Sequence, residues 1–123
     1  MTILADTSVW IDHFRRRDPV LARFLDRGEV VMHPFVIGEL ALGTASKIAS
    51  LMDDLHDLPK AKAANNDEVL KFIAERKLAG SGIGYVDAHL LAAAALSPET
   101  FIWTRDKRLL AVAQSLALAS GEN

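Results

Sequence analysis

The chain has 123 residues, half of which are hydrophobic, so it can bury a substantial core and is not expected to be disordered. It contains no cysteine, which excludes disulfides, zinc–thiolate sites and cysteine nucleophiles and is compatible with the cytoplasmic location that we expect. The net charge of −2 argues weakly against nucleic-acid binding, because nucleic-acid-binding proteins are usually basic. We expect no signal peptide and no membrane span, since the chain starts without a basic segment and its longest apolar run, Leu90 to Leu96, is short of the roughly 20 residues needed.

The first half of the chain predicts alternating strands and helices. Apolar runs that end at polar residues predict strands at residues 3–6 and 30–33. Helices are expected from residue 7 or 8 to 14, from 18 to 28, from 34 to 43, and around the apolar positions Ile48, Leu51, Met52 and Leu55 up to Pro59. Proline near the start of two of these helices and glycine at two of their ends support those bounds.

The second half continues the alternation. Residues 60–64 predict a loop or a short edge strand, and a capped helix then runs from about residue 66 to Gly80. A flexible glycine-rich connection, residues 80–84, leads to an alanine-rich helix at 85–96, a buried strand at 101–103, a helix from 106 to about 118, and a frayed tail. The whole predicts one α/β domain, residues 1–123, with helices on both faces of a parallel sheet.

Two of the predicted strands lead to an acid. Asp6 follows the run Ile3-Leu4-Ala5, and Asp106 comes shortly after Phe101-Ile102-Trp103. The carboxyl ends of parallel strands meet at one edge of a sheet, where α/β proteins bind ligands. Taken singly, each acid also fits a helix cap or a first-turn acid.

Two further acids, Glu39 and Asp87, lie in otherwise apolar helices, where each faces either solvent or a functional cavity. If all four acids converge, their repulsion either raises their pKa values or is relieved by a cation. Mg²⁺ and Mn²⁺ prefer oxygen ligands of this kind, and such an ion can orient a phosphodiester for attack by water. The four acids therefore predict a divalent-metal site that acts on phosphate.

The sequence around these acids resembles a known family. The relevant stretches are Asp6-Thr7-Ser8-Val9-Trp10-Ile11, Glu39 after Gly38, Gly84-Tyr85-Val86-Asp87-Ala88-His89-Leu90-Leu91-Ala92, and Thr104-Arg105-Asp106-Lys107-Arg108-Leu109. In this order they resemble the PIN-domain family and, more narrowly, its VapC-type toxins of bacterial toxin–antitoxin systems. The resemblance spans nearly the whole chain.

This resemblance implies a three-layer α/β/α sandwich with a central, mostly parallel sheet of four to five strands. It implies an endoribonuclease in which Asp6, Glu39, Asp87 and Asp106 bind one or two Mg²⁺ or Mn²⁺ ions. Such toxins cut structured RNA, often tRNA or ribosomal RNA, and leave a 3′-hydroxyl and a 5′-phosphate. They form homodimers and larger hetero-oligomers with a VapB-type antitoxin that neutralises them.

Other residues near the acids have two interpretations each. The hydroxyls of Thr7, Ser8 and Thr104 either support the metal ligands or only cap helices. Trp10 and Phe14, on one helix face, belong to the core or line a groove for the antitoxin. The arginines Arg15, Arg16, Arg17, Arg105 and Arg108 either contact RNA phosphates or serve solubility. The histidines His13, His33, His56 and His89 share no metal-ligand spacing and are expected to be structural or on the surface.

Three other functions fit parts of the sequence. A phosphate-accepting receiver domain would need paired acids after the first strand and a lysine ending a late strand, whereas Thr7-Ser8 and Thr104-Arg105-Asp106 stand there. An aspartate-nucleophile phosphatase would need an acid at Ser8. A non-catalytic binding module with the PIN fold stays open, although such a module would not need all four acids.

Overall fold

Parallel pairing of short strands forms the centre of the fold. The computed structural model describes residues 1–43 and 45–123. In it β1 (Thr2–Ala5) lies between β2 (Val30–Val31) and β3 (Thr100–Trp103), and both neighbours run parallel to β1. Leu4 pairs with Val31 on one side and with Ile102 on the other. These apolar strands are almost entirely buried, as expected for a parallel sheet that is covered on both faces.

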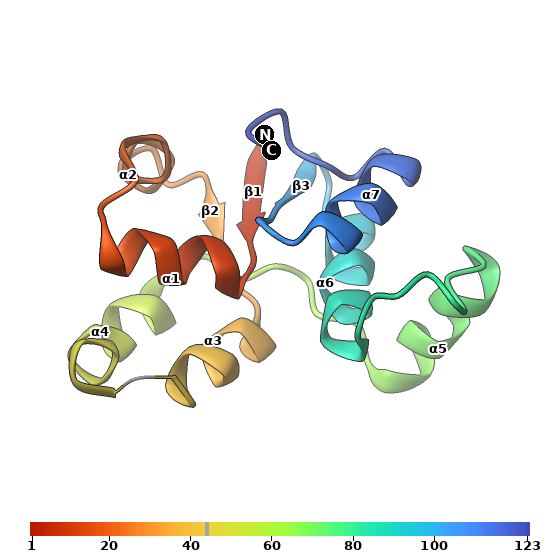
Figure 1. The fold of residues 1–123 in the computed structure, drawn as a ribbon, viewed down its shortest axis with the longest axis horizontal. Helices are drawn as coiled ribbons and strands as arrows, with labels where there is room; N and C mark the ends of the chain where they lie inside the picture. Colours follow the sequence, from red (N-terminus) through yellow and green to blue (C-terminus); the bar gives the residue numbers. More distant parts are fainter. Residues whose placement is uncertain (44) are drawn as a thin grey trace.

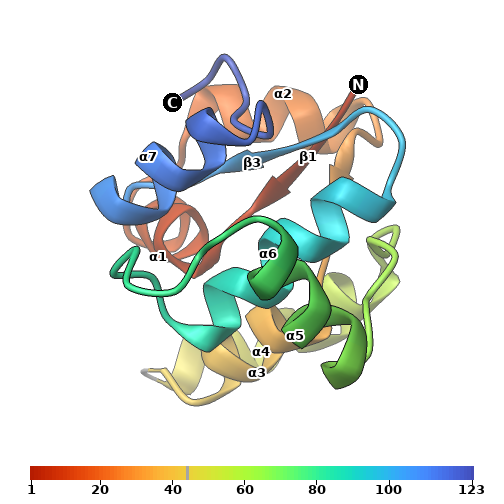
Figure 2. The ribbon, with the colours of Figure 1, turned by 90° about the vertical axis from the view of Figure 1, so that its right-hand side faces the viewer.

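Helices cover the sheet on both sides, which confirms the expected α/β/α fold class. The helices of the described residues are α1 (Thr7–Arg15), α2 (Pro19–Asp26), α3 (Pro34–Ala41), α4 (Ala45–Asp57), α5 (Asn66–Glu75), α6 (Tyr85–Leu96) and α7 (Lys107–Ser115). Figures 1 and 2 show α1 and α2 on one side of the sheet and α6 and α7 on the other. The side chain of Ile48 in α4 lies outside the described residues.

The sheet is narrower than expected. The described part of the chain forms three strands, whereas the resemblance implied four to five. Single parallel bridges extend the sheet at each edge, from Met32 to Lys60 beyond β2 and from Ile102 to Ala119 beyond β3. Residues 60–64 were predicted to form either a loop or a short edge strand, and they contribute one bridge and no strand.

The last helix and the tail differ from the expectation. Residue Ala117 has a φ of 56°, a left-handed conformation that ends the helix before Leu118 and turns the chain back to the sheet. Ile102 N–H donates to the Leu118 carbonyl at 2.7 Å, and Ser120 N–H donates to the Ile102 carbonyl at 2.9 Å. The expected frayed tail is instead held by Asn123, whose Nδ2 donates to the same Ile102 carbonyl at 2.8 Å.

The core lies between the sheet and the inward faces of the helices. Its largest fully buried side chains include Trp10, Leu40, Leu91 and Leu109. The alanine-rich helix α6 buries most of its length, so its small side chains let it pack closely against the sheet, as predicted. Among the described residues, no helix combines the length and apolar character that crossing a bilayer requires.

A buried histidine starts helix α3. His33 is 1% exposed, and its Nδ1 accepts a hydrogen bond from the Phe35 N–H at 3.0 Å, so it caps the helix that carries Glu39. Burial, and to a smaller extent the charge of nearby His89, lowers the pKa of His33 from 6.5 to about 4. His33 is therefore a structural histidine, neutral at physiological pH, in agreement with the sequence-based expectation.

This pKa predicts a specific loss of stability in acid. Unfolding restores the ordinary pKa of 6.5. Between that pH and about pH 4, His33 is therefore protonated in the unfolded chain but not in the folded one. Stability therefore falls as the pH drops through this window, and we expect His33 to account for about 2 kcal/mol of the loss between pH 7 and pH 5. Urea denaturation of wild type and His33→Asn at both pH values measures it. Asparagine can cap the helix but does not titrate, so equal pH dependence of the two proteins would contradict the assignment.

Candidate active site

The ends of β1 and β3 bring Asp6 and Asp106 to one edge of the sheet. Asp6 N–H donates to the Trp103 carbonyl at 3.0 Å, which continues the strand pairing past Ala5. Asp6 is 6% exposed and caps α1, because its Oδ1 accepts the Val9 N–H at 3.3 Å. Asp106 caps α7, because its Oδ1 accepts the N–H groups of Arg108 at 2.8 Å and of Leu109 at 3.0 Å. Both acids thus act as helix caps and also lie where the strands end.

The hydroxyls of Thr104 and Ser8 hold Asp6 from both sides. Thr104 Oγ1 donates to Asp6 Oδ2 and accepts the Asp106 N–H at 3.0 Å. Ser8 Oγ donates to Asp6 Oδ1 at 2.5 Å and accepts the Arg105 N–H at 2.9 Å. Of the two interpretations of these hydroxyls, the geometry favours support of the carboxylate over simple capping, and it joins the two strand ends through Asp6.

Glu39 and Asp87 come from two different helices, α3 and α6. Glu39 is exposed on α3 and accepts a hydrogen bond from Thr7 Oγ1 at 2.7 Å, which ties it to the start of α1. Asp87 lies in the first turn of α6, and its Oδ2 accepts the Gly84 N–H at 3.3 Å. Within the described residues, one oxygen each of Glu39, Asp87 and Asp106 accepts no hydrogen bond.

Two of the four carboxyl groups, those of Asp6 and Asp87, have raised pKa values. Burial raises the pKa of Asp6, against the hydrogen bonds of Ser8, Thr104 and Val9. Burial also raises the pKa of Asp87, and the negative charges of Asp106, Asp6 and Glu39 raise it further, while the Gly84 hydrogen bond opposes them. Asp87 therefore lies close enough to the other three predicted acids for their charges to act on it.

The donor set suits a divalent cation. Hard cations such as Mg²⁺ and Mn²⁺ bind carboxylate oxygens, and a positive ion would relieve the repulsion that raises the pKa of Asp87. In the described part of the chain, no three acidic or histidine side chains are already arranged around a common ion position. Hydrogen bonds instead hold Asp6 and Asp106 to the starts of α1 and α7, and hold Glu39 of α3 to Thr7 of α1.

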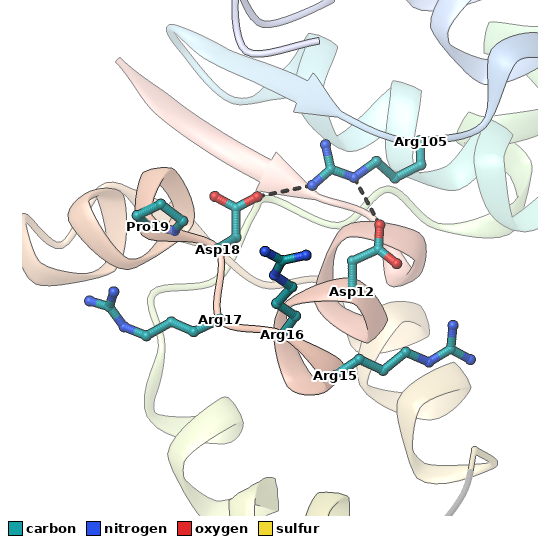
Figure 3. A pocket seen from close by; sticks show the side chains of 7 residues that line it. All are labelled: Asp12, Arg15, Arg16, Arg17, Asp18, Pro19 and Arg105. Carbon is teal, nitrogen blue, oxygen red and sulfur yellow. Dashed lines mark hydrogen bonds and ion pairs between the residues drawn. The ribbon is translucent and has the colours of Figure 1, made fainter.

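Arg105 forms two ion pairs within the protein. It lines a cleft of about 380 Å³ together with Asp12, Arg15, Arg16, Arg17, Asp18 and Pro19, whose side chains are drawn in Figure 3. Its Nε lies 3.1 Å from Asp12 Oδ2 and its NH2 lies 3.0 Å from Asp18 Oδ2, so one guanidinium joins α1 to the start of α2. The guanidinium carbon also lies 5.3 Å from the centre of the Trp103 ring. No sequence pattern indicates these partners, because only the fold brings the three residues together.

The other arginines do not form a single cluster. In Figure 3, Arg15 and Arg17 extend away from the cleft in different directions, and Arg16 points toward the space between Asp12 and Asp18. Arg108 is exposed, and its side chain packs on the backbone of Gly82. Within the described residues Arg108 forms no ion pair, in contrast to the two of Arg105, so it is the better placed of the two to contact phosphate.

The two aromatic residues of α1 have different environments. Trp10 is 2% exposed and is one of the largest core side chains, so of its two interpretations the structure supports the core and not an open antitoxin groove. Helix α1 turns this face toward the sheet, which is why the large aromatic ring lies inside. Phe14 is only partly buried and its ring lies 5.8 Å from that of Trp10, at the edge of the core.

The raised pKa of Asp87 predicts that its charge destabilises the metal-free protein. A carboxyl with a raised folded-state pKa favours folding at low pH, and this contribution is lost as the pH rises above its ordinary value of 3.8. Asp87→Asn should therefore melt at a higher temperature than wild type at pH 7 in EDTA, and the difference should shrink toward pH 4. Asp26→Asn, which removes an exposed charge at the end of α2, is the control. A lower melting temperature for Asp87→Asn alone would contradict the assigned repulsion.

Comparison with known proteins identifies the family. The sequence model of the PIN domain matches residues 3–115. Ribonuclease VapC32 of Mycobacterium tuberculosis strain CDC 1551 / Oshkosh is 43% identical over 120 residues, which cover 98% of this chain and 97% of that protein. Ribonuclease VapC32 of the H37Rv strain shows the same identity and coverage. The match over nearly the full length, on a parallel α/β fold, shows that this chain belongs to the PIN-domain family.

Proposed function

We propose that this chain is a VapC-type toxin, a cytoplasmic endoribonuclease that uses divalent metal and acts as a single domain, residues 1–123. The observation that carries the proposal is geometric: Asp6 and Asp106 lie where the parallel strands β1 and β3 end, joined through Thr104, and Glu39 is hydrogen-bonded to Thr7, the residue after Asp6. The charges of these three acids also act on Asp87. Membership of the PIN-domain family and the similarity to proteins named ribonuclease VapC32 support RNA as the substrate.

The four carboxylates would hold the cation. Three of them offer an oxygen that no described residue occupies, and Asp6 is oriented by two hydroxyls. One or two Mg²⁺ or Mn²⁺ ions bound there would stabilise the negative charge that develops on the phosphate during hydrolysis.

The protein's own groups would orient the reactants. Thr104 and Ser8 fix the Asp6 carboxylate, and Thr7 fixes Glu39, so that the rotation of both acids is restricted before RNA binds. A carboxylate oxygen that is not a ligand can accept a hydrogen bond from the attacking water and aim it in line with the leaving oxygen. Cleavage of the bond from phosphorus to the 3′-oxygen would leave a 3′-hydroxyl and a 5′-phosphate.

The proposed biological role is inhibition of translation. By its resemblance to VapC-type toxins, the chain would cut tRNA or ribosomal RNA and be neutralised by a VapB-type antitoxin. It would form a homodimer and a larger hetero-oligomer with that antitoxin. Partly buried Phe14 remains a candidate antitoxin contact, whereas core residue Trp10 does not.

Cleavage of total cellular RNA by purified, partner-free protein tests this function. Wild type with Mg²⁺ or Mn²⁺ should give discrete products that are absent in EDTA. Asp6→Asn keeps the shape and an acceptor oxygen but removes the charge, and it should lose at least about a hundredfold in rate. Asp26→Asn, with the same chemical change outside the site, should cleave like wild type.

Equal cleavage by Asp6→Asn and wild type would show a contaminating nuclease or remove Asp6 from the mechanism. Cleavage in EDTA would contradict the metal dependence. If wild type binds RNA with Mn²⁺ present but cleaves none of it, the alternative of a non-catalytic PIN-fold binding module is favoured.

A further inference from the structure

Two exposed aromatic rings lie beside the candidate active site. Phe35 on α3 and Tyr85 on α6 are 36% and 46% exposed, which is unusual for large apolar rings. Both rest on His89, with ring centroids 4.4 Å from it for Phe35 and 4.6 Å for Tyr85, and His89 is itself 2% exposed. We call Phe35 and Tyr85 the aromatic ledge, since buried His89 backs two rings that reach solvent.

The aromatic ledge is adjacent in the fold to two of the candidate catalytic acids. Phe35 precedes Glu39 by four residues on α3, so the two side chains emerge from one face of that helix. Tyr85 opens α6 two residues before Asp87, in the same first turn. Both rings are therefore carried by the two helices that also bring acids to the site.

Further contacts fix these rings in place. The Tyr85 hydroxyl donates to Asn66 Oδ1 at 3.2 Å, which links the ring to the start of α5. The Phe35 N–H is held by the capping His33, whose ring lies 5.3 Å from that of Phe35. The rings are therefore preorganised and would lose little conformational freedom when a planar ligand stacks on them.

A basic side chain without an ion pair in the described residues lies near the ledge. Gly82, three residues before Tyr85, has a φ of 87°, and a Cβ at this position would lie 3.2 Å from Arg108 Cδ. The stem of Arg108 therefore packs on the loop that leads into α6, and its exposed guanidinium is placed close to the start of that helix. Aromatic surface with a nearby cation is the combination by which proteins hold a single-stranded nucleic acid, with bases on the rings and phosphate on the cation.

We propose that Phe35 and Tyr85 stack on unpaired nucleobases next to the cleaved phosphodiester, with Arg108 on a neighbouring phosphate. This inference rests on the proposed ribonuclease function and assigns the residues that hold unpaired bases beside the cut. Bases in a duplex are already stacked on one another and cannot reach a protein ring. Because every base has a flat face, the ledge selects unpaired over paired nucleotides and does not read sequence.

Binding of a short RNA that carries the fluorescent base 2-aminopurine tests this, because stacking on an aromatic ring quenches it. The experiment uses EDTA, so that no cleavage occurs, and compares the single strand with the same strand annealed to its complement. Wild type should quench and bind the single strand more tightly than the duplex. Phe35→Leu and Tyr85→Leu keep apolar bulk but lose the ring, and each should weaken binding on the order of tenfold.

Two controls separate stacking from other effects. Tyr85→Phe keeps the ring but removes the hydroxyl bound to Asn66, and it should bind nearly like wild type. Leu70→Ala changes an exposed apolar residue on α5, outside the ledge, and should not alter binding. Thermal melts of every variant show whether a loss of binding merely reports a loss of folding.

Several results would overturn the proposal. The first is that wild type does not quench 2-aminopurine fluorescence. The second is that wild type binds the single strand and the duplex with equal affinity. The third is that Tyr85→Phe binds RNA as weakly as Tyr85→Leu. Conversion of a wild-type dimer to a monomer by both leucine variants, with RNA affinity unchanged, would assign the ledge to contact with a second copy of this chain. Stacking without any cleavage in Mg²⁺ would instead contradict the proposed ribonuclease function and leave the ledge supported.

Discussion

The parallel pairing of β1 with β3 is the constraint on which the rest of the site depends. It brings Asp6 and Thr104 together across 98 positions of sequence, and the Thr104 hydroxyl closes the contact by donating to Asp6. The same hydroxyl also accepts the N–H of Asp106, so Thr104 positions both the side chain of Asp6 and the backbone of Asp106. Without this register, the chain would have acids at strand ends but no common edge at which they meet.

Helix capping and site formation use the same carboxylates. Asp6 and Asp106 satisfy N–H groups at the starts of α1 and α7, and Asp87 does so for the connection before α6. These bonds stabilise the helices and hold the acids in place despite their mutual repulsion. A cation would therefore bind to a structure that is already folded around its ligands, and its charge would offset the repulsion that remains.

The sequence indicates where the acids lie in the fold more directly than it indicates their contacts. An apolar run followed by an acid predicts a strand-end carboxylate, which placed Asp6 and Asp106 correctly at one sheet edge. Glu39 and Asp87 stood out as single charges in apolar helices. The contacts of Arg105 with Asp12 and Asp18 could not be predicted, because they depend on how α1, α2 and the end of β3 meet in space. The location of Trp10, in the core or in a groove, could not be predicted, because helical spacing shows which residues share a face but not what covers that face. The width of the sheet could not be predicted either, because its edges are single bridges that have no local sequence signal.

The central claim is that the four carboxylates together form one cation site. Crystals of the protein grown with Mn²⁺, measured for anomalous scattering, test it directly, since the manganese position does not depend on any assay of activity. We predict an anomalous peak within ligand distance of Asp6 and of at least one other carboxylate among Glu39, Asp87 and Asp106. Manganese bound only elsewhere, or no peak at Mn²⁺ concentrations that saturate RNA cleavage, would contradict the claim.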